Sequence, residues 1–573
     1  MFIFFEALLA NIIIAGYGFL TKRIFNFKIS SENFSSHFFF GLITLCYLGV
    51  LINIFVAIKS TVSFIVIGVG VLLFFLNLKS FLFKTFLFQI IFCCLIVFVL
   101  LIKSKVYDDY ALYYLPTITK ITDSNLILGL SNIHFRFGHN FSLFYGISLF
   151  KNNFFSYQWS FLIPALLYSN FIVYIIFNIL KKKSSSLILS ISIYLLFLYS
   201  VKFYDFGNHG LDVPGSIYFF LIIFLFLKVF DQNIHKEKVM NLFKKILIIS
   251  LFLITLKISY IPVFIFSLIL VVMFWKKIIL KVKKNIFVIL APSLIWIVSN
   301  LLITSCILYP KKELCLPLPW SSPEKKWISS PEEVFIELSA WSKGWIDSAP
   351  NRGADLKFTS REDYINHQKQ FLDSNWLFAY SHHFKNHVLK FIITIFFIIA
   401  FVNFIFRRQL EIIGNYDRKL LLFFLFYSFF AIIYWISTAP LLRFGFAHLF
   451  IFIFSFFLLI FKKTFYSLSA KYIKYFITFC LIIFISRNLN PSRVNNFNDN
   501  FFRPYPNIFS KSHIKYLPTY NTVSVDGGVL NITNGRECFD IPSPCTQFST
   551  IQTSKIKIVK RWIFKSIEIN RND

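Results

Sequence analysis

Long, uninterrupted apolar runs dominate this sequence and decide what it can fold into. A helix needs roughly 20 predominantly apolar residues to cross the hydrocarbon core of a membrane. The stretch 245–275 is too long for one ordinary crossing and is interrupted by Lys257-Ile258-Ser259-Tyr260-Ile261-Pro262, which predicts two short helices meeting at a polar break. We therefore expect an all-α polytopic membrane protein with about 12–14 transmembrane helices. The other runs lie near 1–21, 37–57, 61–78, 85–102, 159–180, 187–201, 215–230, 285–305, 387–406, 420–437, 445–461 and 472–486.

Composition agrees with this class and excludes several others. Hydrophobic residues make up 57% of the chain and charged residues only 15%, whereas soluble domains carry about a quarter charged residues. Soluble multidomain enzymes, disordered chains and coiled coils are thereby excluded. A formal charge of +31 would suggest nucleic acid in a soluble protein. Here the positive charge is explained by an amino-acid usage typical of an AT-rich genome and by basic cytoplasmic loops. We expect no nucleic-acid partner.

The basic residues between the runs predict the orientation of the chain. They fall in alternate loops, and such loops face the cytoplasm. The prediction is a transmembrane domain over 1–486 in the cytoplasmic membrane, with both termini external and with external loops 103–158 and 306–386. Residues 487–573 form a small external C-terminal domain, a mixed α/β tail in which Thr522–Val525 before Gly527-Gly528 predicts a hairpin. The basic groups are Lys22-Arg23, Lys79 and Lys84, Lys181-Lys182-Lys183, Lys236 to Lys245, Lys276 to Lys284, Arg407-Arg408 with Arg418-Lys419, and Lys462-Lys463.

Four of the eight cysteines form two close pairs in segments predicted to be external, Cys306 with Cys315 and Cys538 with Cys545. Short loops closed by disulfides suit an oxidising compartment. A zinc site is the rival interpretation, but the spacings Cys-x8-Cys and Cys-x6-Cys differ from the usual zinc motifs. Disulfides are the preferred prediction.

Unusual polar residues also gather on the predicted external side. Taken singly, each has an ordinary explanation as a solvated acid, a helix cap or a headgroup anchor. Taken together, scarce acids beside cations at helix ends and at a helix break predict a polar basin at the membrane surface. The apolar stretch 141–150 is too short to span, so it lies in the interface or dips in and returns. The candidate residues are Asp108, Asp109, His134, Arg136, His139, Asp212, Lys257 and Arg443, with Asp205 and His209 nearby.

Several motif elements occur in a fixed order and carry a resemblance. The chain resembles a family of bacterial polytopic membrane proteins of unknown function over roughly 100–545, and its architecture resembles the GT-C superfamily, which uses lipid-linked sugars outside the membrane. GT-C enzymes carry a catalytic acid after the first helix, whereas Asp108-Asp109 follows the fourth run. The elements are Asp109-x-x-Leu112-Tyr113-x-x-Pro116, Gly129-Leu130-x-Asn132-x-His134-x-Arg136-Phe137-Gly138-x-Asn140, Asp212-x-Pro214, Lys257-x-Ser259, Cys306…Tyr309-Pro310…Cys315, Arg443-Phe444-Gly445 and Cys538…Pro542-x-Pro544-Cys545.

The expected function is transfer of a sugar from a polyprenyl-phosphate donor to an envelope polysaccharide or glycolipid acceptor on the external side. No cytoplasmic loop exceeds about twenty residues, too few for a nucleotide-binding βαβ unit. Asp109 is the expected base, with Asp108 as second choice, and Lys257 and Arg443 are expected to hold the lipid phosphate. A divalent ion, Mg²⁺ or Mn²⁺, is a candidate bridge that no local spacing demands. Residues expected to shape the substrate pocket are His134, Arg136, His139 and Asp212.

Three alternatives remain open at this point. A transporter or flippase for lipid-linked saccharides would also use broken helices and intramembrane charges. A polymerase of preformed repeat units is a variant of the enzyme class. A non-catalytic membrane assembly protein would tolerate loss of Asp109. Sugar, acceptor, linkage and oligomeric state are not encoded in these patterns.

Overall fold

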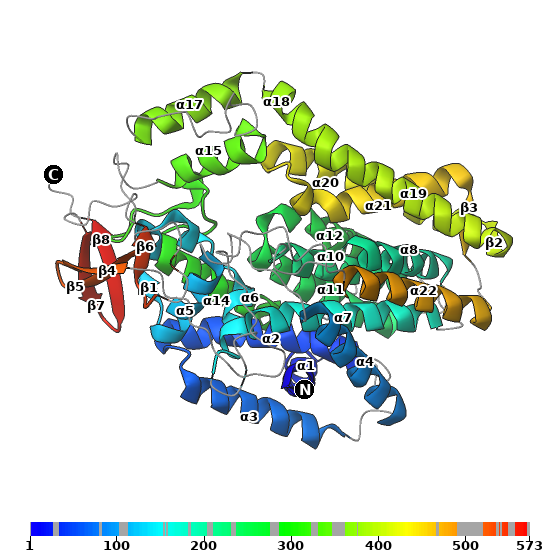
Figure 1. The fold of residues 1–573 in the computed structure, drawn as a ribbon, viewed down its shortest axis with the longest axis horizontal. Helices are drawn as coiled ribbons and strands as arrows, with labels where there is room; N and C mark the ends of the chain where they lie inside the picture. Colours follow the sequence, from blue (N-terminus) through cyan, green and yellow to red (C-terminus); the bar gives the residue numbers. More distant parts are fainter. Residues whose placement is uncertain are drawn as a thin grey trace.

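Most of the described chain forms long helices that run along the long axis of the molecule (Figure 1). The structure is a computed structural model. Its described residues are 2–26, 34–78, 83–101, 113–152, 155, 159–180, 185–202, 210–230, 236–275, 286–321, 330–345, 361–374, 376–465, 469–489, 520–533, 538, 541–547 and 556–569. The helices of the bundle are α1 (Phe2–Ile24), α2 (Phe34–Phe55), α3 (Ser60–Leu76), α4 (Phe83–Leu101), α7 (Trp159–Leu180), α8 (Ser186–Lys202), α10 (Asp212–Val229), α11 (Lys236–Leu256), α12 (Phe264–Met273), α14 (Ile286–Thr304), α19 (Lys390–Ile405), α20 (Asn415–Thr438), α21 (Leu442–Phe461) and α22 (Ala470–Leu489).

The apolar runs of the sequence coincide with these helices. Within the described ranges, ten helices are long and apolar enough to cross a membrane, and four shorter apolar helices accompany them. The protein is therefore a largely helical, multi-pass membrane protein. The prediction for 245–275 is confirmed, because α11 ends at Leu256 and a 3₁₀ segment, Ile258–Val263, separates it from α12.

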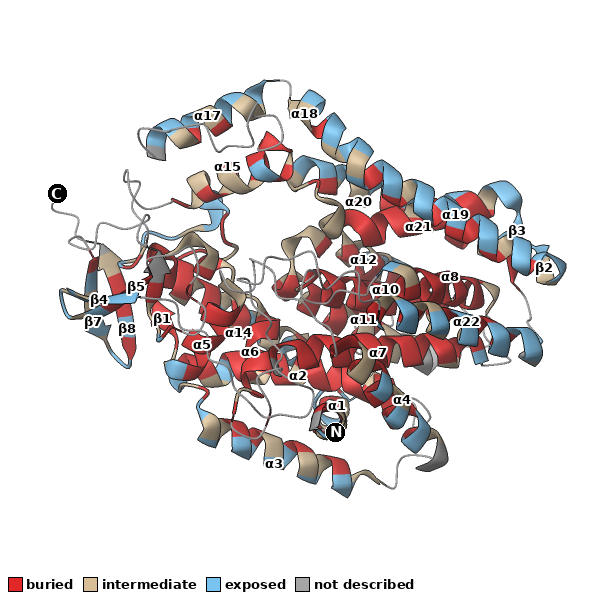
Figure 2. Cartoon of the chain, viewed as in Figure 1, coloured by how far each residue is buried: buried red, intermediate tan, exposed pale blue. Residues whose placement is uncertain are grey.

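The outer surface of the bundle is as apolar as its interior. Figure 2 shows a buried core surrounded by helices with exposed faces, α3, α19 and α22 among them. Many exposed side chains on the bundle are large and apolar, such as Phe397, which is 71% exposed. Contiguous apolar surface of this kind is normal where lipid is the solvent.

Close approach of the first two helices depends on glycine. A Cβ atom on Gly18 would overlap the backbone of His37, and one on Gly41 would overlap the carbonyl oxygen of Ile14. Small residues allow helix backbones to touch in this way inside membranes. The close contact fixes α1 against α2 at the base of the bundle.

Two short helices lie between α4 and α7. They are α5 (Leu115–Asp123) and α6 (Ser142–Ser148). All residues of 142–150 are buried, and α6 packs on α2, with Gly49 against Tyr145 and Gly146 against Cys46. Neighbouring helices therefore cover the apolar side chains of this segment, and its expected position at the membrane interface or as a re-entrant segment stays a prediction.

The C-terminal region contributes two small sheets. Strands β8 (Phe564–Ile569) and β7 (Ile556–Arg561) pair antiparallel, and β8 also pairs in parallel with β1 (Ile127–Leu128). The second sheet has the order β4 (Tyr520–Val525), β5 (Gly528–Thr533) and β6 (Cys545–Gln547), which confirms the hairpin predicted at Gly527-Gly528. From Tyr520 on, the described residues of the tail form strands, turns and coil. The expected helical part of a mixed α/β tail is not among these described residues.

Segments predicted to be external meet at one end of the molecule. Leu128, Trp320 and Ile567 belong to one apolar cluster, which joins the loop before α6, the loop after α14 and the C-terminal strands. Helices α15 (Pro331–Ser342), α17 (Arg361–Asp373) and α18 (Trp376–His383) lie above α20 in Figure 1. A π-helical turn, Phe384–Leu389, makes α18 and α19 one continuous apolar rod.

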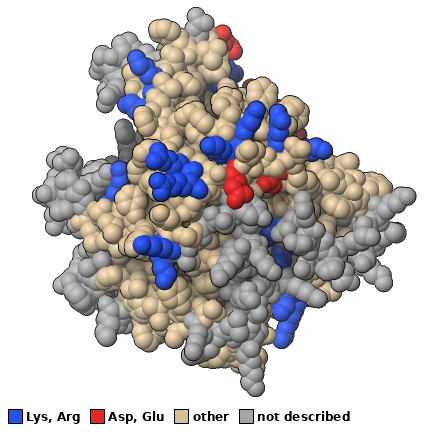
Figure 3. All heavy atoms as spheres, turned by 90° about the vertical axis from the view of Figure 1, so that its right-hand side faces the viewer, with Lys and Arg blue, Asp and Glu red and all other residues tan. Residues whose placement is uncertain are grey.

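The opposite end carries basic residues predicted to be cytoplasmic. Strands β2 (Leu410–Ile412) and β3 (Lys463–Phe465) pair there, bringing Arg407-Arg408 and Lys462-Lys463 to one end of the bundle. Figure 3, which views the right-hand side of Figure 1, shows Lys and Arg in greater number than Asp and Glu. The two ends therefore differ in architecture.

Candidate functional site

Asp212 is the centre of a charged cluster at the end of the bundle that is predicted to be external. It is the first residue of α10, and its side chain is 7% exposed. The carboxylate contacts the Lys257 ammonium through Oδ1, and the Nε of Arg443 lies 3.8 Å from Oδ2. Three residues far apart in sequence, each predicted as a site residue, are thus brought together.

Lys257 reaches Asp212 because α11 stops there. The residue has extended backbone angles, φ −165° and ψ 127°, between α11 and the following 3₁₀ segment. Its ammonium also lies 3.3 Å from the ring centroid of Phe444. A buried cation is stabilised by a counter-ion or by the face of an aromatic ring, and Lys257 has both in Asp212 and Phe444.

The motif Arg443-Phe444-Gly445 begins α21, and each member has a packing role. The Arg443 guanidinium lies 5.1 Å from the Phe444 ring centroid and 5.6 Å from that of Trp341 in α15. Gly445 faces the indole of Trp435, where a Cβ atom would come within 2.5 Å of the ring. The indole in turn donates to the Leu441 carbonyl at 2.9 Å. Glycine therefore lets α20 and α21 close tightly enough to aim Arg443 at Asp212.

A pocket of about 220 Å³ opens beside this cluster. Both polar and apolar side chains line it, from the C-terminal end of α8, the N-terminal ends of α10 and α21, and the middle of the rod α18–α19. Sequence reasoning did not select Lys202, His383 or His387 as site residues. The signal was present, since Lys202 is one of few basic residues at a predicted external helix end. The lining residues are Lys202, Asp212, His383, His387, Phe391, Leu441, Leu442, Arg443 and Phe446.

Basic side chains predominate among the described charged residues of this site. Lys202, Lys257 and Arg443 lie around the Asp212 carboxylate. Cations inside a partly buried pocket attract anions more strongly than they would in water, because the local dielectric constant is lower. Arginine and lysine together suit phosphate oxygens. The arrangement is chemically fitted to an anionic group that carries an apolar tail.

The 129–140 stretch lies on the same side as the cluster. The Arg136 guanidinium is 5.6 Å from the ring centroid of Tyr113, and His134 Nδ1 accepts from the Arg136 backbone N–H at 3.2 Å. His139 stacks on Phe141 and meets Tyr309 edge to face. Burial lowers the pKa of His139 to about 4, and the positive charges of Arg136 and Lys257 contribute in the same direction. His139 is therefore neutral at physiological pH and feels the charge of Lys257.

Other residues of the same stretch hold the loop in place. The Asn132 amide donates to the carbonyls of Trp320 at 3.1 Å and Ile567 at 2.9 Å. The Asn140 amide donates to Asn300 Oδ1 at 2.8 Å, and its carbonyl oxygen Oδ1 accepts from the Tyr145 hydroxyl at 2.7 Å. The asparagines of this motif are thus anchors to α14, α6 and the C-terminal strands.

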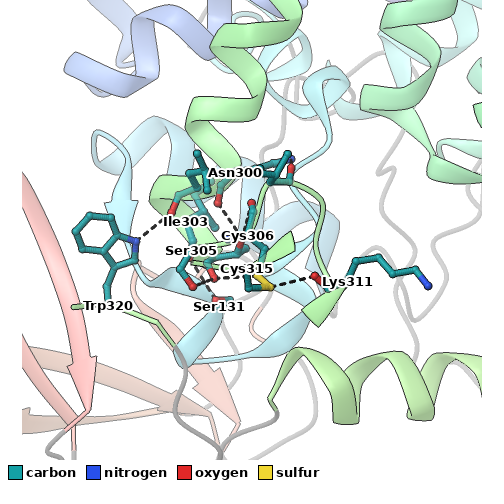
Figure 4. The surroundings of a disulfide bond; sticks show 11 residues. Ser131, Asn300, Ile303, Ser305, Cys306, Lys311, Cys315 and Trp320 are labelled. Atoms are coloured by element: carbon teal, nitrogen blue, oxygen red, sulfur yellow. Dashed lines mark hydrogen bonds between the residues drawn. A yellow bond between two sulfur atoms is a disulfide. The ribbon is translucent and has the colours of Figure 1, made fainter. Parts of the chain in front are cut away.

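The Cys306–Cys315 disulfide closes the loop that supports His139. The sulfur atoms are 1.96 Å apart, and Figure 4 shows the bond just after the end of α14, with Ser131 and Trp320 nearby. Tyr309, inside this loop, covers Gly138, where a Cβ atom would come within 2.5 Å of its ring. The second pair, Cys538 and Cys545, is also joined. Both predicted pairings are present.

The predicted acids Asp108 and Asp109, together with Asp205 and His209, lie outside the described residues. The described structure resumes at Tyr113. Tyr114 packs against Gly210, where φ is +38° and a Cβ atom would overlap the phenol. Tyr114 therefore lies beside Gly210, which precedes Asp212 by two residues in the sequence.

The described residues do not form a metal centre. Among them, no group of three or more His, Cys, Asp or Glu side chains is arranged to hold a metal ion. Asp212 is a poor donor for a divalent ion because both of its oxygens face cations. The expected Mg²⁺ or Mn²⁺ stays a prediction that concerns Asp109.

Comparison with known proteins places the chain in a family. Residues 1–450 match the model of a domain of unknown function, DUF8201. The match covers most of the chain, so the protein belongs to this family. No curated protein and no solved structure matches it.

Proposed function

We propose that this protein is an integral membrane glycosyltransferase that uses a polyprenyl-phosphate-linked sugar outside the bacterial cytoplasmic membrane. The acceptor is an envelope polysaccharide or glycolipid. One observation carries the proposal: Lys257 and Arg443 converge on Asp212 beside a pocket with further basic and apolar lining.

The pocket supports a lipid phosphate as ligand. Lys257 and Arg443 would bind the phosphate oxygens, and Lys202 lies on the same wall. Phe391, Leu442 and Phe446 supply apolar surface for the first isoprene units. Asp212 keeps the two cations in place before the ligand arrives, which lowers the cost of ordering them on binding.

The chemistry assigned to the site is a substitution at the anomeric carbon. The acceptor hydroxyl oxygen forms a bond to that carbon while the bond to the phosphate oxygen breaks. The proton of the hydroxyl passes to the Asp109 carboxylate, and the electron pair leaves with the polyprenyl phosphate. Lys257 and Arg443 stabilise the charge that develops on the phosphate. Neutral His139 can orient the acceptor by hydrogen bonding.

Replacement of Asp109 tests the catalytic assignment. In the Asp109→Asn variant, we expect the envelope glycan measured by mass spectrometry to lose one sugar, with undecorated acceptor accumulating outside. Asp123→Asn, an acid in α5, is the matched control and should leave the glycan unchanged. Unchanged glycan from a normally inserted Asp109→Asn protein would contradict the proposal.

The flippase alternative predicts a different outcome. A flippase variant would accumulate lipid-linked sugar on the cytoplasmic side, whereas a transferase variant accumulates donor and acceptor outside. Asp212 and Arg443 of the pocket lie in the first turns of α10 and α21, whereas His387 and Phe391 come from the middle of the α18–α19 rod. The position of these two charged residues at helix ends favours the transferase. A polymerase would share the site and differ in yielding short, unjoined repeat units when inactivated.

A further inference from the structure

The C-terminal region has two hairpins whose tips differ in chemistry. Strands β4 and β5 close through Asp526-Gly527, with φ +81° at Gly527. Asp-Gly is a favoured pair for a two-residue hairpin turn. Strands β7 and β8 are joined by the turn Trp562-Ile563, which lies between the paired residues Arg561 and Phe564.

The backbone conformation and the exposed apolar side chains of the Trp562-Ile563 tip are unfavourable in an aqueous environment. Trp562 has φ +54°, a left-handed conformation that bulky side chains rarely adopt. Its side chain is 81% exposed and that of Ile563 is 55% exposed. Folding therefore buries little of the Trp562 side chain and only part of the Ile563 side chain, while it fixes an unfavourable backbone conformation at the turn.

The charges next to the tip are also unfavourable in isolation. Lys560 and Lys565 are directly opposite each other in the β7–β8 register, and both are exposed. Directly opposed residues of antiparallel strands point to the same face, and like charges there repel. An anion held by both ammonium groups would remove this repulsion.

The tip is fastened to the end of a membrane-spanning helix. The Asn125 amide donates to the Ile563 carbonyl at 3.0 Å. The neighbouring Leu126 N–H donates to the carbonyl of Asn53, in the last turn of α2, at 2.8 Å. Immediately beyond Asn53, Phe55 and Val56 are exposed apolar residues. The tip is therefore linked, through Asn125 and Leu126, to the C-terminal end of α2.

We propose that the β7–β8 tip is an interfacial anchor that enters the external leaflet of the same membrane. Trp562 and Ile563 would lie at the boundary between headgroups and acyl chains, where tryptophan is enriched. Lys560 and Lys565 would bind anionic lipid phosphates. The anchor would fix the C-terminal sheets, and the 126–137 loop paired with them, at a set height above the bilayer. This proposal does not depend on the glycosyltransferase activity.

A fluorescent depth measurement tests the anchor. A cysteine at Ile563 keeps Trp562 in place and can be labelled selectively, because the four free cysteines are buried and the other four are paired. Val529→Cys in β5 is the matched control, since Val529 is 52% exposed on the other hairpin. The labelled, full-length proteins are placed in phosphatidylglycerol nanodiscs with or without shallow spin-labelled lipid.

We expect the spin-labelled lipid to cause roughly a twofold loss of fluorescence at position 563 and a loss of less than about a tenth at 529. Adding Trp562→Gly, which suits the turn, should reduce the quenching at 563 without unfolding the sheet. Replacing phosphatidylglycerol by neutral lipid should weaken it. Equal, weak quenching at 563 and 529 would overturn the anchor, and quenching that ignores lipid charge would overturn the role of the two lysines.

Discussion

Asp212 is held between cations from two other segments, which makes it a structural partner as well as a site residue. Its burial is what gives the cluster its energetic weight. A buried ion pair gains little over an apolar pair, but removing one partner leaves an uncompensated charge. The same arrangement leaves Lys257 and Arg443 in place to receive a second, external anion.

Asp212→Asn is expected to destabilise the folded protein by about 3–5 kcal/mol, because Lys257 and Arg443 would lose their shared counter-ion. Thermal unfolding in detergent measures this. Lys257→Met in the same chain should add less than its own separate loss, since Lys257 contacts Asp212 and residues in contact are not additive. A double variant that loses the sum of the two single-variant losses would show that Asp212 and Lys257 do not interact.

His139 provides a prediction about pH. Its pKa in the folded protein is about 4, whereas an unfolded chain protonates histidine near pH 6.5. Stability from this residue is therefore complete above about pH 6.5 and is lost as the pH falls toward 4. The melting temperature of the native protein should fall over this range more steeply than that of His139→Gln. Parallel profiles would contradict the assignment.

Residue-level prediction from the sequence was strongest for charges at helix ends. Asp212, Lys257 and Arg443 stand out because acids and cations are scarce beside apolar runs, and the structure joins them. Contact itself could not be predicted, since nothing in the local pattern says which helix ends are neighbours. His383 was missed because it lies within an apolar rod that starts eleven residues before the predicted run at 387.

At the scale of elements, helix positions followed directly from the apolar runs, and the break at 257–262 was visible as a polar interruption. Strand pairing was harder to foresee. The β4–β5 hairpin has an Asp-Gly turn, whereas β7–β8 turns through Trp-Ile and gave no turn signal. The parallel pair β1–β8 joins residues more than four hundred positions apart, which no local pattern encodes.

The disulfide loop after α14 is expected to stabilise the fold and to position His139. Cys315→Ser should lower stability by about 2–4 kcal/mol, because the unfolded chain regains the freedom of the open loop. It should also raise the pKa of His139, since Tyr309 would cover that imidazole less tightly. Thermal unfolding and NMR titration measure the two effects. A variant with unchanged stability would show that the loop is held by packing alone.

At the scale of the whole molecule, the two ends of the bundle are built from different elements. One end gathers the sheets, the disulfide loops and the charged pocket, while the other presents Arg and Lys beside β2 and β3 (Figures 1 and 3). The alternation of basic loops predicts that the first end is external.

Labelling from outside the cell tests the orientation. A cysteine at Glu362 in α17 should react with a membrane-impermeant maleimide in intact cells. One at Glu411 in β2 should react only after the membrane is permeabilised. The native free cysteines are buried and give little background. Simultaneous labelling of both positions in intact cells would contradict the predicted topology.

The most direct test of the central claim is binding of polyprenyl phosphate to the purified protein, measured by native mass spectrometry. We expect the native protein to bind the phosphate more tightly than the uncharged polyprenol. Lys257→Met and Arg443→Met should each weaken binding about tenfold or more, while Lys312→Met, an exposed cation paired with Glu332, should not. Equal affinity for phosphate and alcohol, or full affinity in both pocket variants, would contradict it.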